Sequence, residues 1–173
     1  MQSTWRQDAV PLFLLTAFPI HIWSYYNVLR EFPAWLARLN RGDLIATIGF
    51  SQLMPFVESV IVFVPCMLLT LWLARRFDRQ ERLAIMFIVL LVSTVWSIVF
   101  HWTVDSIRHW RLEFIGLLAL YLATLAVPVL LILRSKSVIA SLVEAIERIN
   151  VLSAIYIAVD AICLLIVIGY LLI

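Results

Sequence analysis

Five long runs of mostly apolar residues dominate this sequence, and each is long enough to cross a lipid bilayer as a helix. The runs cover residues 9–29, 53–74, 83–102, 114–133 and 151–172. The hydrocarbon core of a bilayer is roughly 30 Å thick, so a helix that rises about 1.5 Å per residue needs about 20 residues to cross it. The runs are continuous and rich in Leu, which excludes a barrel of alternating strands. We therefore predict an all-α integral membrane protein, a bundle of about five transmembrane helices forming a single domain over residues 1–173.

Composition excludes several other classes of protein. Apolar residues make up 64% of the chain and charged residues 14%, more apolar surface than a soluble core can absorb. The net charge of +2 and the lack of a basic stripe argue against nucleic acid as a partner. No nucleotide-binding, hydrolase or paired-cysteine motif is present, so we predict no cofactor. The expected partners are membrane lipids and other membrane-protein subunits or further copies of this chain.

Two segments between the predicted spans mix charged and apolar residues in a way typical of helices that lie in the headgroup plane. They are residues 31–40 and residues 137–149, and the second can continue into the fifth span. Gly42 and Asp43 are expected to break or cap the chain between the first two spans. Residues 44–50 remain open, as either an interfacial or a re-entrant lead-in to the second span.

The distribution of basic residues predicts the orientation of the chain. With five spans, eight Lys and Arg residues fall on the side of the amino terminus and five on the opposite side. The compact turn at residues 75–82 contributes four of the eight. The positive-inside rule then predicts a cytoplasmic amino terminus and an external carboxy terminus in a multi-pass cell-membrane protein.

Ionisable residues inside the spans are the best pointers to a functional site, because each costs free energy in hydrocarbon. Three qualify: His21, Glu58 and Asp160. Their positions along the spans place His21 somewhat beyond the middle toward the outside, Glu58 in the outer third and Asp160 near the midplane, so all three could share one pocket in the outer half of the bundle. Tyr156 lies four residues before Asp160, on the same helix face. We therefore predict an intramembrane polar pocket of these four residues, although each could instead only bond a neighbouring helix.

Asp160 belongs to a longer polar stripe on the last span. The other members at helical spacing are Ser153, Tyr156 and Cys163.

A second row of polar side chains follows the third span. His101, Asp105 and His109 are spaced four residues apart, which places imidazole and carboxylate groups on one helix face and makes them weak candidates for metal ligands. They fall at the predicted outer interface, where polar residues need no special reason. We therefore predict no metal site.

Three functions fit this sequence. The preferred hypothesis is a non-catalytic subunit or scaffold of a membrane complex, because the chain is small and lacks a soluble domain or a catalytic motif. The second is a small proton- or cation-coupled transporter that uses Asp160 and Glu58. The third is a membrane-embedded enzyme acting on a lipid-like substrate, with His101, Asp105 or Glu58 as acid, base or metal ligand. No catalytic residue is identified, and the sequence leans away from an enzyme.

Overall fold

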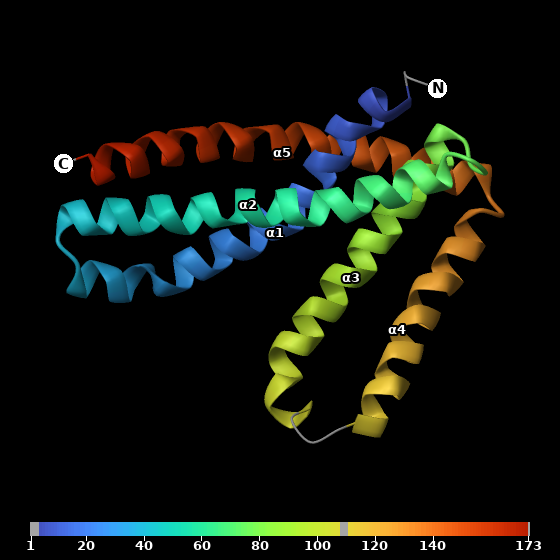
Figure 1. Cartoon of the computed structure of the whole chain (residues 1–173), viewed down its shortest axis with the longest axis horizontal. Coiled ribbons are helices and arrows are strands. Elements are labelled where there is room, and N and C mark those ends of the chain that lie inside the picture. The colour runs from blue at the N-terminus through green and yellow to red at the C-terminus, as the bar shows by residue number, and fades with distance from the viewer. Residues whose placement is uncertain (1–3, 108–110, 173) are drawn as a thin grey trace. The chain divides into compact units, whose positions relative to one another are not determined.

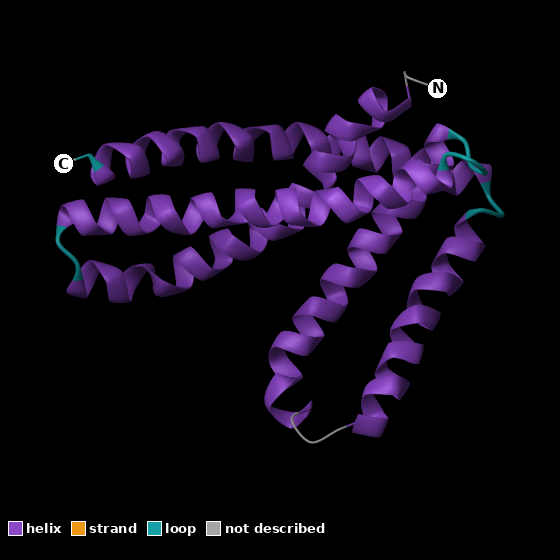
Figure 2. Cartoon of the chain, viewed as in Figure 1, coloured by secondary structure: helices purple, strands orange, loops and turns teal. Residues whose placement is uncertain are grey.

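The computed structural model describes residues 4–107 and 111–172, with side chains for residues 8–102 and 115–172. Within these residues every regular element is a helix, and short turns connect them (Figure 2). The helices are α1 (Thr4–Arg38), α2 (Arg41–Leu73), α3 (Arg79–Ile107), α4 (Arg111–Ile132) and α5 (Lys136–Leu171). Each of the five contains a segment long and apolar enough to cross a membrane. The predicted all-α membrane fold is confirmed.

The helices are longer than the predicted spans. Residues 31–40 do not form a separate helix, because α1 runs without a break to Arg38. Residues 44–50 belong to α2, and residues 137–149 and 151–172 form one continuous helix, α5. The charged residues of these segments lower the local hydropathy but leave the backbone free to stay helical. Pro33 does not end α1 either, which is in keeping with the tolerance of membrane helices for proline.

Side-chain caps mark where the helices begin. Asn40 Oδ1 accepts the backbone N–H of Asp43 at 2.9 Å, and its amide nitrogen donates to Asp43 Oδ2 at 2.7 Å. Asn40 therefore caps α2, whereas Gly42, one of the expected breakers, lies inside the first turn. Asp78 and Glu81 form a reciprocal capping box before α3, at 2.8 and 3.0 Å.

The chain divides into two compact units. The first unit contains α1, α2 up to Leu69 and α5 from Ile146. Within it, the side chain of Tyr170 near the end of α5 donates a hydrogen bond to Asp43 Oδ1 near the start of α2, at 2.9 Å. The two helices therefore run antiparallel (Figure 1). Ser24 of α1 donates to the carbonyl oxygen of Ser51 at 3.1 Å, which fixes the pairing of α1 with α2.

The second unit contains α3 and α4, which form a helical hairpin (Figure 1). The hydroxyl groups of Ser93 and Tyr121 lie 2.9 Å apart, and Trp96 Nε1 donates to Thr124 Oγ1 at 2.9 Å. The Trp96 ring also meets Tyr121 edge-on. These side-chain contacts hold the two apolar helices in register.

Gly49 marks the closest approach between α2 and α5. A Cβ atom at this position would lie 3.3 Å from a methyl group of Val167 and 3.5 Å from the carbonyl oxygen of Cys163. We therefore expect Gly49→Leu to force the helices apart and to lower the free energy of unfolding by about 1–3 kcal/mol, the usual effect of overpacking. Thermal unfolding of the purified protein in detergent measures the change.

Gly116 of α4 provides the matched control for this prediction. A Cβ atom there would meet nothing within 4 Å, so Gly116→Leu should leave the unfolding midpoint unchanged. Equal destabilisation by both substitutions would contradict a tight contact at Gly49.

Candidate functional site

A buried histidine–aspartate pair joins α1 to α5 inside the first unit. His21 is 0% exposed and Asp160 is 4% exposed. His21 Nε2 lies 2.8 Å from Asp160 Oδ2, across 139 positions of the sequence. Both residues belong to helices suited to crossing a membrane. The predicted pocket residues His21 and Asp160 are therefore in direct contact.

The hydrogen bonds of His21 define how many protons the pair holds. Its other ring nitrogen, Nδ1, lies 2.8 Å from the carbonyl oxygen of Ala17. A carbonyl oxygen only accepts hydrogen bonds, so Nδ1 must carry a hydrogen. One further proton then lies between Nε2 and Asp160 Oδ2. It resides either on the imidazole, which gives an ion pair, or on the carboxyl group, which gives two neutral side chains.

Aromatic rings enclose the imidazole. The ring of Tyr156 stacks on His21 with centroids 5.5 Å apart and planes 7° from parallel. Tyr25 and Phe18 surround Tyr156 in turn, with ring centroids 5.5 and 6.4 Å from it. The stacked Tyr156 ring constrains the plane of the His21 ring, and burial excludes solvent from the contact with Asp160, which strengthens their electrostatic interaction.

The first unit also contains buried polar atoms that no described protein group satisfies. Asp160 Oδ1 has no hydrogen-bond partner among the described residues, nor has either amide atom of Gln52, a residue only 3% exposed. Gln52 lies one turn after Gly49, on the face of α2 that meets α5. Burying polar atoms without partners is costly, so these unpartnered atoms are the ones that need a further explanation.

Gln52 was not among the predicted pocket residues, because the prediction started from ionisable side chains inside the spans. The signal that could have found it is plain in retrospect. Gln52 is the single glutamine in the apolar stretch of residues 44–74.

Glu58 lies elsewhere on α2. Its side chain is exposed, and among the described residues it forms no hydrogen bond or ion pair. The buried pair of Asp160 is therefore made with His21 and not with Glu58.

The row of possible metal ligands is only partly described. His101 is exposed on α3, whereas the Asp105 side chain and His109 lie outside the described residues. Among the side chains that are described, no three His, Cys, Asp or Glu residues come together as a metal site would require.

Fold and site together define a polytopic α-helical membrane protein with a histidine–aspartate pair buried inside its helices. Comparison with known proteins finds no matching family model, no matching curated protein and no matching solved structure. We therefore infer the function from the geometry of the site alone.

The pair makes a direct prediction about stability. His21→Leu leaves the Asp160 carboxylate buried without a donor and should lower the free energy of unfolding by about 2 kcal/mol. This value lies between two reference values for the loss of stability. Breaking a buried ion pair typically costs about 3–5 kcal/mol, whereas removing one hydrogen bond between membrane helices costs less. The double variant His21→Leu with Asp160→Leu removes both polar groups and should recover most of that loss.

A double-mutant cycle measured by denaturant titration in micelles tests this coupling. Additive effects of the two substitutions would show that the side chains do not interact.

Proposed function

We propose that the protein is a small proton- and cation-coupled transporter whose coupling site is the His21–Asp160 pair. The observation that carries this proposal is the 2.8 Å contact of His21 Nε2 with Asp160 Oδ2, combined with the bond from Nδ1 to the Ala17 carbonyl. Together they leave the pair with one exchangeable proton. We therefore prefer the transporter hypothesis to the subunit hypothesis, with His21 in the role expected of Glu58.

Charge balance explains how such a pair would couple two ions. With its shared proton, the pair has no net charge, which suits an apolar interior. Loss of the proton leaves Asp160 negative beside a neutral imidazole, and a buried uncompensated charge is strongly unfavourable. A monovalent cation beside Asp160 Oδ1 would restore neutrality. The free oxygen of Asp160 and the unpartnered side-chain oxygen of Gln52, on the face of α2 that meets α5, are oxygen ligands of the kind that alkali and other hard cations prefer.

The exchange that follows is electroneutral. One proton leaves the pair as one monovalent cation enters, and the reverse step returns the proton. The orientation we propose, amino terminus cytoplasmic and carboxy terminus outside, rests on the excess of eight basic residues over five.

Transport by this site can be tested in vesicles. Proteoliposomes loaded with a pH-sensitive dye should show proton efflux when Na⁺ or K⁺ is added outside, and none with an impermeant organic cation. Asp160→Asn removes the negative charge that needs compensation, so the cation-dependent flux should fall to that of protein-free vesicles.

Ser153→Ala is the matched control for this flux assay. Ser153 is also buried on α5, seven residues before Asp160, but it bonds only the carbonyl oxygen of Ile149 at 3.0 Å. This variant should transport at the normal rate. A wild-type protein without ion-dependent flux, or an Asp160→Asn protein with full flux, would contradict the proposal.

A second candidate function, a subunit of a membrane complex, is favoured by the exposure of Glu58. Its neighbours Met54, Val57 and Ile61 are also exposed, by 56%, 46% and 65%. Glu58 is about 17 residues from the start of α2 and 15 from its end, more than 20 Å either way at about 1.5 Å per residue. A carboxylate on an apolar helix face this far from both ends is unfavourable in lipid unless a donor covers it.

The partner that fits this face is a transmembrane helix of another protein with a Lys or Arg at the same depth. A second copy of this chain fits less well, because a symmetric contact through the same face would bring two Glu58 carboxylates together.

A designed peptide tests this partner chemistry. A Leu-rich transmembrane peptide with one central Lys should bind the labelled protein in vesicles about tenfold more tightly than an all-Leu peptide, the effect of one strong bond between membrane helices. Energy transfer between fluorophores measures the binding. Glu58→Leu should abolish the preference, whereas Met54→Leu on the same face should retain it.

Equal binding of the two peptides to the normal protein would exclude a basic partner helix. Energy transfer between two labelled copies that depends on Glu58 would indicate self-association instead.

A further inference from the structure

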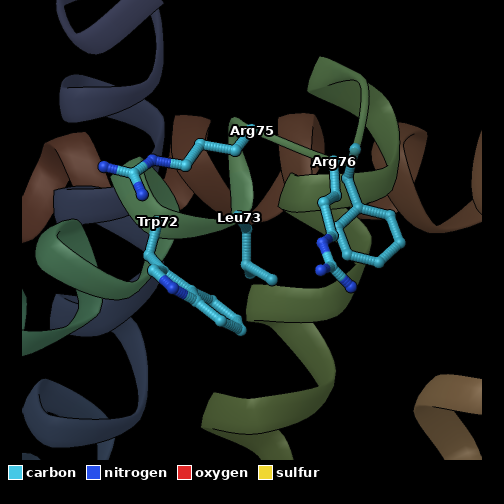
Figure 3. Close-up of a pocket in the computed structure, with 5 residues that line it drawn as sticks. Trp72, Leu73, Arg75 and Arg76 are labelled. Carbon is cyan, nitrogen blue, oxygen red and sulfur yellow. The ribbon is translucent and has the colours of Figure 1, made fainter.

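A hollow of about 350 Å³ lies where α2 ends and the chain turns toward α3. It is lined by Trp72, Leu73, Arg75, Arg76 and Phe77. The side chains of Trp72, Leu73 and Arg76 extend to the same side of the turn, whereas Arg75 extends away from them (Figure 3). A cationic group and an aromatic ring thus flank a small apolar floor.

The backbone around the hollow is well held. The N–H groups of Arg76 and Phe77 both bond the carbonyl oxygen of Leu73, at 2.9 and 3.0 Å, which closes the end of α2. The guanidinium group of Arg82 donates to the carbonyl oxygen of Phe77 at 3.0 Å. The relative positions of the lining residues are therefore determined by local hydrogen bonds.

The acidic residues of the turn are committed to other contacts. Asp78 and Glu81 bond each other's backbone N–H groups in the capping box of α3. Among the described residues, neither Arg75 nor Arg76 forms an ion pair, and both are exposed. The turn thus presents two guanidinium groups that form no ion pair with a described residue, beside the apolar hollow.

We propose that this hollow binds an anionic phospholipid, with Arg76 on the phosphate group and Trp72 and Leu73 against the glycerol and upper acyl chain. Arginine binds phosphate through two parallel N–H donors, a geometry that lysine does not reproduce. Trp72 is 62% exposed at the end of an apolar helix, where tryptophan commonly meets the headgroup region. A free phosphate ion would use Arg76 but would gain nothing from the apolar floor.

Retention of lipid by the purified full-length protein tests this site. The protein is equilibrated in nanodiscs of equal parts dioleoyl phosphatidylglycerol and dioleoyl phosphatidylcholine, and native mass spectrometry counts the lipids that stay bound. We expect the anionic lipid to be preferred, and Arg76→Gln to reduce that preference about fivefold, the usual contribution of one basic residue at an anionic surface. Arg76→Lys should give an intermediate loss.

Lys136 supplies the matched control, since it is an exposed cation at the start of α5 that does not line the hollow. Lys136→Gln should leave the lipid preference unchanged. An equal loss in both variants would show general surface charge and overturn the site. Displacement of the lipid by excess inorganic phosphate would identify free phosphate as the ligand, and lack of any preference in the normal protein would also overturn the proposal.

Discussion

An ionisable group buried among apolar helices must be neutralised where it lies, and in this protein that requirement is met by the pairing of His21 with Asp160. An isolated carboxylate in a medium of low dielectric constant is unfavourable by many kcal/mol, so the fold must place a donor within hydrogen-bond distance. The donor comes from another helix, α1, which ties the position of α1 to that of α5. Phe18 and Tyr25 of α1 also contact Tyr156 of α5, so aromatic packing joins the same two helices.

The remaining contacts of the first unit follow from this arrangement. Helix α2 can approach α5 closely only where a side chain is missing, and Gly49 provides that position. One turn further along, α2 buries the side chain of Gln52, which is only 3% exposed. A buried amide with both ends unpartnered is hard to explain by packing alone, so Gln52 supports the proposal of a polar species bound within this unit.

The sequence predicted the membrane fold and singled out Asp160 as a candidate site residue, because both inferences depend on properties of single segments. Hydropathy identifies a helix that can cross a membrane, and an acid in its middle is conspicuous. The partner of Asp160 was harder to predict. Position along a helix gives depth, but not the rotation of one helix against another, so the sequence could not show which of His21 and Glu58 faces Asp160. The continuity of α5 was among the expectations, whereas residues 31–40 were expected to form a separate interfacial helix and instead belong to α1, because charge alone does not end a helix.

The two acids of this chain that depart most from their apolar surroundings have opposite environments, and that difference argues for separate roles. Asp160 is buried and shares a proton with His21, so the pair carries no net charge. Glu58 is exposed on a helix face whose neighbours are apolar, so its charge can be balanced only by something outside the described residues. A chain that needed Glu58 only for its own stability would gain by replacing it with leucine, since that removes the unfavourable transfer of a carboxylate into lipid. The exposed carboxylate of Glu58 therefore supports the proposed basic partner helix, whereas the enclosed His21–Asp160 pair supports the proposed proton and cation chemistry within the chain.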